Sequence, residues 1–359
     1  MNILLGTFRF FSLTGTETFT YTIARQLSRL GHKIYLYSPF IGGKIFKKSK
    51  KLSIFISGNL ADFKNEKIDL IHVQHNLTSI LLRYAFPQIP SIYLIHGPTP
   101  YLEQMPSFLD FNYYGAISGE LVEHLSTSGK DPKKIFLFPN SVDTKRFSPE
   151  STISKWPKKL LVMSNYFHKD GQHVFKKAAK KLNLEIKFIG GKKQIWSVEK
   201  EINKADVVAS LGRGAIEAMS CGRSVLIFNY SGGIYKNGDG LLKKSNIPLI
   251  AKTNFSGRAI KIPFTEKNVK RELLKYDQTD GSINRECVQK NHSISKNIKI
   301  LLSFYKKASL EKPASFNKKQ LDFSAKGLNE MLSYEKLIYR YRDFKSLLFT
   351  RFKDQIMPR

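Results

Sequence analysis

The chain has 359 residues, 42% of them hydrophobic and 12% aromatic, and its formal net charge at pH 7 is +30. This length exceeds one ordinary core and the composition is globular, so we expect two folded domains and exclude fibrous and disordered classes. No apolar run reaches the roughly 18 residues that a membrane-spanning helix needs. Two distant cysteines define no disulfide framework, and the start MNILLGTF lacks a basic leader. We therefore expect a cytoplasmic protein without a signal peptide.

Short apolar runs alternate with helical segments in the first half of the chain, which indicates βαβ units and a parallel sheet. A helix is predicted from Phe19 to Leu30, after a loop that ends with Leu13–Glu17 and before Gly31. The predicted strands are 2–5, 33–37, 68–73, 92–95, 115–118 and 135–138.

The same alternation restarts after a turn-rich segment at residues 139–149. The strands predicted there are 159–163, 186–189, 207–209 and 225–228. The sequence thus predicts an α/β protein with two Rossmann-like domains whose parallel sheets face each other across a cleft. We divide it into a domain at 1–152, a second at 153–292, and a C-terminal helical extension at 293–359.

The segment from Ala205 to Gly233 predicts a ligand site. It reads as a strand, the turn Gly212-Arg213-Gly214, and a helix beginning near Ala215, which would place Glu217 in the first helical turn. Ligands of open α/β sheets bind beyond the carboxyl ends of the strands. Glycines let a backbone approach a ligand, free helix N–H groups favour anions, and a neighbouring cation and carboxylate suit a nucleotide diphosphate with a ribose diol. A capped helix without a ligand is the alternative, because Glu is favoured in any first turn.

Several short motifs follow one another in a recognisable order and spacing. They are Thr14–Glu17, Leu30–Ile34, Asp69–Val73, Ile95–Gly97, Ala116–Ser118, Pro139–Asp143 with Phe147–Pro149, Ala205–Val207 and Glu217–Gly222. Together they resemble the GT-B glycosyltransferases of the large retaining class known as family 4, over about residues 1–309. The resemblance implies a GT-B fold, an acceptor domain first and a nucleotide-sugar domain second, and transfer with retention.

Two departures from the family pattern affect the implied site. Ala209 stands where the family has a Glu that contacts the transferred sugar. In the segment Ser164–Gly171, Lys169 matches the family's Lys, whereas Asn165 stands near the place of its Arg. We infer that Arg213 supplies the missing cation.

The candidate site residues come from these motifs. His96 is included because it follows a strand end, which should face the cleft, whereas His72, inside an apolar strand, is better explained as a core residue. Gly15 precedes a helix N-terminus, which suits a diphosphate or a sugar. The predicted catalytic residues are His96, Lys169 and Arg213, and the predicted donor-binding residues are Gly15, Thr16, Asn165, Gly190, Gly214 and Glu217. We expect no metal and no cofactor, with a UDP- or GDP-sugar as co-substrate.

The predicted function is transfer of a sugar from a nucleotide-sugar donor to a cell-envelope, polysaccharide or glycolipid acceptor. The partners expected are the nucleotide sugar and a saccharide or lipid-linked acceptor. Two alternatives stay open: a GT-B binding or scaffold subunit without activity, and a sugar-nucleotide epimerase.

The high positive charge and the C-terminal tail raise the question of polyanionic partners. A strongly basic surface attracts polyanions, but no zinc-finger, RNP or helix-turn-helix signature supports a specific nucleic-acid partner. A helix is predicted from about Lys326 to Lys353, and it carries an apolar stripe. The chain from Lys296 to its end contains 15 basic and 6 acidic residues. Docking on the protein's own surface, oligomerisation, and peripheral contact with an anionic membrane on its inner face all remain open for this tail.

Overall fold

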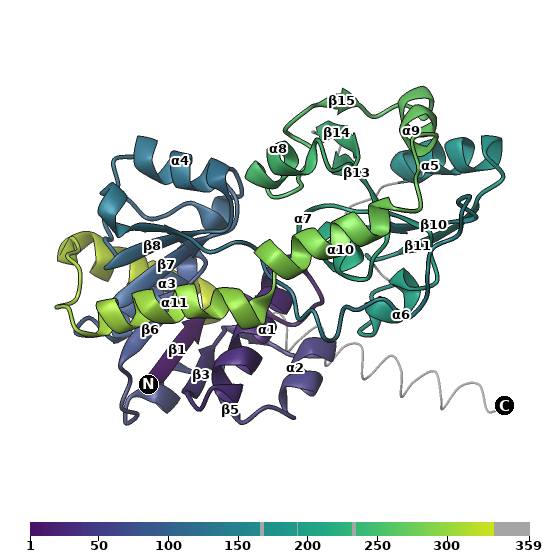
Figure 1. Ribbon diagram of the computed structural model, residues 1–359. Helices are drawn as coiled ribbons and strands as arrows, with labels where there is room; N and C mark the ends of the chain where they lie inside the picture. The colour runs from purple at the N-terminus through teal and green to yellow at the C-terminus, as the bar shows by residue number, and fades with distance from the viewer. Residues whose placement is uncertain (166–168, 192, 232–234, 334–359) are drawn as a thin grey trace, which may run out of the picture.

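The computed structural model describes residues 1–165, 169–191, 193–231 and 235–333. Two α/β units stand next to each other, each built on its own sheet (Figure 1). All seven strands of the N-terminal sheet are parallel, in the order β5-β3-β1-β6-β7-β8-β9. They are β1 (Asn2–Gly6), β3 (Lys33–Tyr37), β5 (Ile54–Ser57), β6 (Leu70–Val73), β7 (Ser91–Ile95), β8 (Tyr113–Ala116) and β9 (Ile135–Leu137). Apart from β5, which was not predicted, these strands follow the predicted series.

Helices and short 3-10 turns connect these strands. They are α1 (Gly15–Arg29), α2 (Gly43–Ser49), η1 (Leu60–Phe63), α3 (Asn76–Ala85), η2 (Tyr101–Glu103), α4 (Gly119–Thr127) and η3 (Pro132–Lys134). A small parallel ladder joins β2 (Arg9–Phe10) to β4 (Phe40–Ile41).

Helix α1 begins four residues before the predicted start at Phe19. The Glu17 carboxylate turns back and accepts hydrogen bonds from the backbone N–H and the hydroxyl of Thr14, at 3.2 and 2.8 Å. It also accepts from the N–H groups of Phe11 and Ser12. Because this buried carboxylate organises the helix start, the segment predicted as a loop is the first turn of the helix.

The C-terminal sheet has the order β11-β10-β12-β13-β14-β15. Strand β14 pairs antiparallel with both β13 and β15. Its strands are β10 (Lys159–Met163), β11 (Glu185–Ile189), β12 (Val207–Ala209), β13 (Ser224–Ser231), β14 (Tyr235–Leu241) and β15 (Ile262–Pro263). The accompanying helices are α5 (Lys169–Lys181), α6 (Val198–Ile202), α7 (Gly212–Ser220), α8 (Ile247–Lys252), α9 (Glu266–Leu273) and α10 (Asp280–Asn291). Two hydrophobic clusters form the core around this sheet.

Helix α11 (Ile294–Ser309) leads back from the C-terminal unit to the N-terminal one (Figure 1). Phe304 stacks on Phe136 of β9 with ring centroids 4.1 Å apart, and the Tyr305 hydroxyl is hydrogen-bonded to Nδ1 of His72. Burial lowers the pKa of His72 to about 3. His72 is thus a neutral core residue, and α11 joins the N-terminal core.

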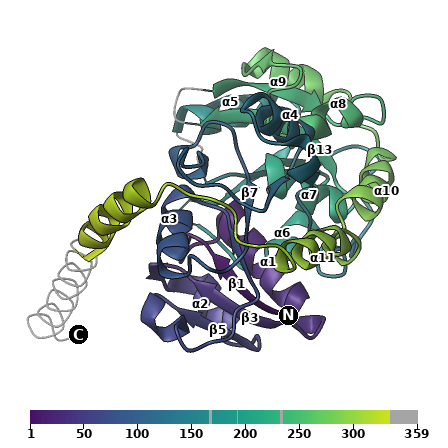
Figure 2. The same cartoon turned by 90° about the vertical axis from the view of Figure 1, so that its left-hand side faces the viewer.

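The chain then docks on the N-terminal unit. Residues 318–333 are helical and lie beside α3 (Figure 2). Leu321 and Leu332 are buried in the N-terminal core, and Arg83 of α3 donates a 2.7 Å hydrogen bond to the Ala314 carbonyl. The tail helix therefore begins earlier than predicted and, as far as it is described, packs on the protein's own surface. The predicted part from residue 334 to Lys353 lies outside the described residues.

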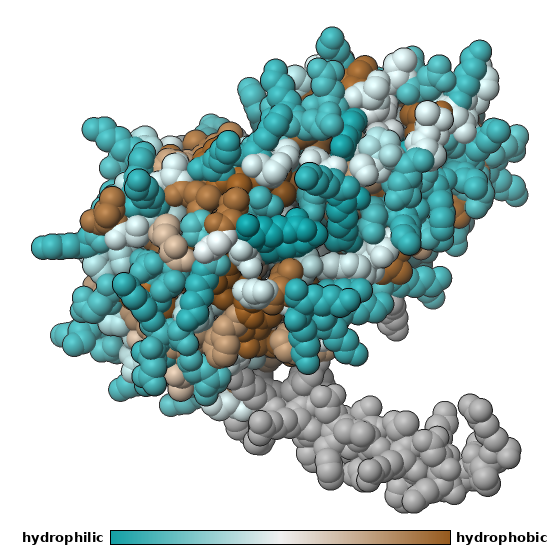
Figure 3. All heavy atoms as spheres, turned by 60° about the horizontal axis from the view of Figure 1, so that its bottom comes forward, coloured by the Kyte–Doolittle hydropathy of each residue, from teal (hydrophilic) through white to brown (hydrophobic). Residues whose placement is uncertain are grey.

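Direct contacts join the two units across the cleft. Arg258 of the C-terminal unit binds both carboxylate oxygens of Glu120 in α4, at 3.2 and 2.5 Å. Figure 3 shows one face of the molecule, on which hydrophilic side chains predominate and hydrophobic atoms appear in patches between them. Among the described residues, no helix combines the length and the apolarity that crossing a membrane requires.

Candidate functional site

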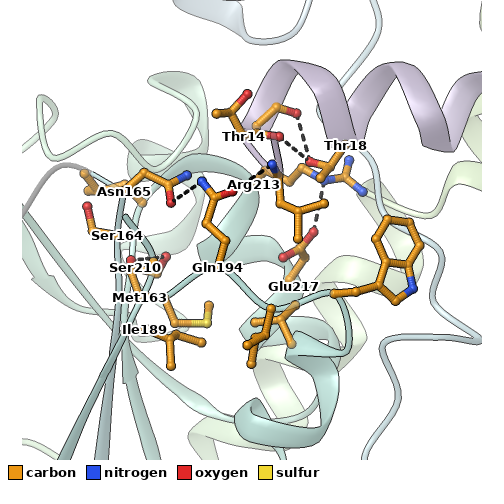
Figure 4. Close-up of a pocket in the computed structure, with 18 of the residues that line it drawn as sticks. Thr14, Thr18, Met163, Ser164, Asn165, Ile189, Gln194, Ser210, Arg213 and Glu217 are labelled. Carbon is orange, nitrogen blue, oxygen red and sulfur yellow. Dashed lines mark hydrogen bonds and ion pairs between the residues drawn. The ribbon is translucent and has the colours of Figure 1, made fainter. Parts of the chain in front are cut away.

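A cavity of about 380 Å³ lies between the two units (Figure 4). Its walls come from the start of α1, the carboxyl ends of β10 and β11, the loop after β11, and α7. The lining residues are Leu13, Thr14, Gly15, Thr16, Thr18, Tyr21, Thr22, Arg146, Phe147, Met163, Ser164, Asn165, Ile189, Gly190, Gln194, Ile195, Trp196, Val198, Ser210, Leu211, Arg213, Gly214 and Glu217. This is the place where open α/β sheets bind ligands.

Arg213 and Glu217 form an ion pair within α7. The helix begins at Gly212, so Glu217 lies in the second turn and the prediction of a first-turn position was wrong. The Arg213 Nε lies 3.0 Å from Glu217 Oε1, and the two side chains are only 7% and 13% exposed. Burial raises the pKa of the Glu217 carboxyl, and the charge of Arg213 opposes this shift. The pair therefore brings a carboxylate and a cation to the cavity wall, as the sequence predicted.

The Arg213 guanidinium also connects α7 to the rest of the protein. It donates to the Ser141 carbonyl at 2.7 Å and to the Thr22 hydroxyl of α1 at 2.9 Å. Together with the Glu217 contact, these bonds use three of the five N–H groups of the side chain. Arg213 thus fixes the position of α7 relative to the N-terminal unit, and within the described residues two of its N–H groups are left for other partners.

Three glycines allow close approach of the backbone at the wall of this cavity. Gly15, the first residue of α1, has open space where a Cβ would stand, and the first N–H groups of a helix lack intrahelical partners. Gly190 has φ +114, and a Cβ there would lie 2.1 Å from the Ser164 carbonyl oxygen. A Cβ on Gly214 would lie 2.3 Å from Ser210 Oγ, so this glycine lets α7 pack closely on the end of β12.

Asn165 and Gln194 close the cavity on the side of β11. The Asn165 Oδ1 accepts hydrogen bonds from Gly191 N, at 3.0 Å, and from Gln194 Nε2, at 3.1 Å. Gln194 Oε1 in turn accepts from the Leu13 N–H of the other unit at 3.0 Å. Asn165 therefore shapes the loop that links the two units.

Trp196 completes this wall. The Arg146 guanidinium lies 4.7 Å from the Trp196 ring centroid, and Tyr21 of α1 meets the indole edge-on at 5.0 Å. Arg146 is held by Glu199 at 2.9 Å. No sequence motif pointed to Gln194, Trp196 or Arg146. A tryptophan in a short loop with polar neighbours was the available signal, but the residues it contacts are distant in the sequence.

Two predicted catalytic residues lie outside the cavity lining. Lys169 is exposed at the first position of α5. His96 follows β7, where its Nε2 lies 2.8 Å from Gln74 Oε1 and its ring meets Phe19 edge-on at 4.6 Å. The remaining seven candidates, namely Gly15, Thr16, Asn165, Gly190, Arg213, Gly214 and Glu217, line the cavity. Within the described residues, no three His, Cys, Asp or Glu side chains are placed to hold a metal ion.

Comparisons with known proteins agree with this architecture. Residues 13–146 match the model of Glycosyltransferase Family 4. A glycosyltransferase from Rickettsia africae superposes with a TM-score of 0.62 at 16% identity, over 86% of this chain and 98% of its own. HepE from Anabaena, in complex with UDP and glucose, gives 0.60 at 14% identity over 84% and 98% of the two chains. The lipopolysaccharide outer core galactosyltransferase WaaB, in its apo form, gives 0.52 at 14% identity over 86% and 100%. No curated protein matches the chain. These similarities confirm the predicted GT-B fold.

Proposed function

We propose that this chain is a glycosyltransferase that moves a hexose from a nucleotide sugar to a saccharide or lipid-linked acceptor. The GT-B fold and the match of residues 13–146 to the model of Glycosyltransferase Family 4 support this proposal. The observation that carries this proposal is the cavity between the sheets, in which the Glu217 carboxylate, the Arg213 guanidinium and the start of α1 meet. UDP-sugars are the first donors to test, because HepE is described in complex with UDP, glucose and UDP-glucose.

The charges of the cavity suit the parts of such a donor. A carboxylate that accepts hydrogen bonds from both ribose hydroxyls forms strong, charge-assisted bonds, and we assign this role to Glu217. The diphosphate is placed against the free N–H groups at the start of α1 and the remaining N–H groups of Arg213. Lys169 is assigned to the same anion from the start of α5.

The proposed reaction needs no protein nucleophile. The anomeric C–O bond breaks as the nucleoside diphosphate leaves, and the acceptor oxygen bonds to the anomeric carbon while its proton passes to the departing phosphate. Negative charge develops on the leaving oxygen, where preorganised N–H groups and cations lower the barrier. Attack from the face of the leaving group gives retention, which the family resemblance implies.

Because of Ala209, a binding subunit without activity remains an alternative function. It is buried in β12, with 1% exposure, where the family pattern has a sugar-contacting Glu. A transferase with a different sugar preference and a binding protein without activity both fit this change. An epimerase is the third possibility.

Incubation with UDP-, GDP- and ADP-sugars distinguishes these cases. We expect one UDP-sugar to bind in calorimetry and to be hydrolysed slowly without an acceptor, releasing UDP and an unchanged sugar. Binding without release of UDP would favour the binding subunit, and an altered free sugar would favour the epimerase. No binding of any nucleotide sugar would contradict the proposal.

A further inference from the structure

A loop with an unusual backbone follows α8. Asn254 and Phe255 have φ angles of 54° and 53°, and Gly257 has a φ angle of 83°. Residues with a side chain rarely adopt this left-handed conformation, which costs free energy and persists only where the surrounding structure imposes it. The contacts of the loop, residues 253–258, show what imposes it here.

Phe255 anchors this loop on the start of α7. Its side chain is 0% exposed within the C-terminal core, and its N–H donates to the Ile250 carbonyl at 3.1 Å. Its own carbonyl oxygen accepts a hydrogen bond from the N–H of Gly212, the first residue of α7, at 3.0 Å. The first N–H groups of a helix have no intrahelical partner. The left-handed turn therefore lets one residue fill the core and also satisfy the start of the helix that carries Glu217.

Arg258, at the end of the same loop, binds the N-terminal unit. Its guanidinium lies 3.2 and 2.5 Å from the two carboxylate oxygens of Glu120, a bidentate geometry that makes such pairs strong and directional. Glu120 is the second residue of α4, and the side chains of Arg258 and Glu120 are 29% and 30% exposed. Figure 1 shows α4 beside α8, the helix that precedes the loop. The loop thus connects α4 of one unit to the first residue of α7 in the other.

Helix α7 is therefore tied to the N-terminal unit at two points. Its second residue, Arg213, donates to the Thr22 hydroxyl of α1 at 2.9 Å. Its first residue is bonded to the loop that ends in Arg258. Because a helix moves as a rigid element, these two connections determine where α7 stands relative to α1. Glu217 of α7 and Thr22 of α1 line the same cavity, so the connections also determine its width.

We propose that the Arg258–Glu120 pair holds the two units together, and that Arg258 is a positioning residue whose loop places α7 and Glu217 against α1. An isolated exposed ion pair contributes little to stability, but this pair ends a strained loop that is bonded to the start of α7. Breaking the pair should let the units separate and should weaken nucleotide binding. The nucleotide part rests on the proposed function, whereas the separation of the units does not.

Exchange of the two charges tests the pair. Glu120→Arg and Arg258→Glu each place two like charges opposite each other, whereas the double variant restores an ion pair with the charges reversed. We expect the units to stand farther apart, or at a broader range of distances, in each single variant. The double variant should return to the native distance.

Pulsed electron paramagnetic resonance measures this distance in the full chain. Spin labels are attached in the variants Lys133→Cys and Lys180→Cys, which are combined in one chain. Both lysines are exposed, and they lie in different units. Cys287 is changed to Ser in all proteins compared, whereas Cys221 is buried and stays unlabelled.

Lys33→Glu is the matched control, because Lys33 forms an ion pair with Glu66 at 3.1 Å within the N-terminal unit. It should change neither the distance between the units nor the affinity for UDP. If a single charge exchange prevents folding, Glu120→Gln and Arg258→Gln break the pair without repulsion and should give the same change to a smaller degree.

Calorimetry with UDP gives the second measurement. Within the part of the chain that the structure describes, neither Arg258 nor Glu120 lines the cavity, so a loss of affinity cannot come from a lost contact with the nucleotide. Each single exchange should weaken UDP binding by about fivefold, a common size for coupling between separate sites. The double variant should bind UDP within about twofold of the native protein.

The outcomes separate the parts of the proposal. A native distance in both single variants, or a double variant that stays separated, would overturn the role of the pair in holding the units. A changed distance with unchanged UDP affinity would overturn the positioning role of Arg258. Distances as expected, in a native protein that binds no nucleotide or nucleotide sugar, would instead overturn the proposed function.

Discussion

Arg213 binds the Glu217 carboxylate at 3.0 Å and the Thr22 hydroxyl of the opposite unit at 2.9 Å. One side chain therefore holds the residue assigned to the ribose and also bridges the cleft. A change in the position of α1 relative to α7 must break one of these bonds or move Glu217. The two units and the donor site are coupled through this guanidinium.

Glu217→Ala should weaken UDP binding by about tenfold or more, because each charge-assisted hydrogen bond to a ribose hydroxyl is worth on the order of 1.5–3 kcal/mol. Calorimetry with UDP measures the loss. Glu201→Ala is the control, because Glu201 pairs with Lys187 and Lys204 away from the cavity. Equal affinity of native protein and Glu217→Ala would remove Glu217 from the donor site.

Arg213→Met should lower the thermal midpoint more than the double variant Arg213→Met with Glu217→Gln. The single change leaves a largely buried carboxylate without its partner, which costs up to about 3–5 kcal/mol for a fully buried pair and less here, since Glu217 is 13% exposed. Thermal unfolding of both variants at neutral pH gives the comparison. Equal midpoints would mean that water or another group takes over the role of Arg213.

Lys169→Ala and Arg213→Ala should reduce turnover more than they reduce uridine affinity, since charge on the leaving diphosphate develops in the transition state. Steady-state kinetics with the donor and calorimetry with uridine separate the two effects. Lys180→Ala, near the other end of α5, is the control for lost positive charge. Native turnover in Lys169→Ala would exclude that lysine, which lies outside the cavity lining, from the diphosphate site.

The sequence predicted most strands of the two sheets and seven of the residues that line the cavity, because both follow from local patterns. Apolar runs indicate buried strands, and parallel strands bring their carboxyl ends, with the motifs that follow them, to one edge. Strand β14 was missed because YKNGDGL has neither an apolar run nor alternation, and it forms by pairing with β13. The Trp196 wall was missed for a related reason: its partners Tyr21 and Arg146 come from other parts of the fold.

Helix starts were the other source of error. Glu17 caps α1 from inside the helix, and Gly212 starts α7 with φ +51, a conformation that glycine adopts without strain. In both places the sequence suggested a loop or a turn, because Thr, Gly and Ser are typical of loops. Seven of the nine candidate residues nevertheless line the cavity, since their place near the strand ends does not depend on the exact helix start, whereas His96 and Lys169 do not line it.

Glu103 should make the protein less stable as the pH rises from about 4.5 to about 7. Burial raises the pKa of Glu103 to about 7, while a hydrogen bond from the His96 backbone opposes the shift. The folded state therefore binds a proton more tightly than the unfolded state, and this contribution is present below the unfolded pKa and is lost as the pH passes the folded pKa. Glu103→Gln should gain on the order of 1–3 kcal/mol over the native protein between pH 5 and pH 8. Urea unfolding at both pH values measures this difference, with the exposed Glu123→Gln as control, and a difference that does not change with pH would contradict the burial of a charged carboxylate.

The described part of the tail should be needed for stability. Leu321 and Leu332 are buried in the N-terminal core, and each fully buried leucine contributes about 2 kcal/mol. A chain ending at Ser309 should therefore unfold at a lower temperature than one ending at Ser333. Equal thermal midpoints would show that this packing adds nothing to the fold.

Membrane contact is accordingly expected from the residues after Ser333, which include seven Lys or Arg and three Asp or Glu. Basic amphipathic segments bind anionic bilayers through apolar burial and roughly 1 kcal/mol per cation near the surface. The full chain should sediment with vesicles that contain phosphatidylserine, and less so as salt rises. A chain ending at Ser333 should bind these vesicles more weakly and keep its UDP affinity, since it retains the cavity and the packed helix. Vesicles of neutral phosphatidylcholine control for apolar binding alone. Equal sedimentation of the two chains would assign the contact to the folded part, and absence of sedimentation for both would exclude an anionic membrane as a partner.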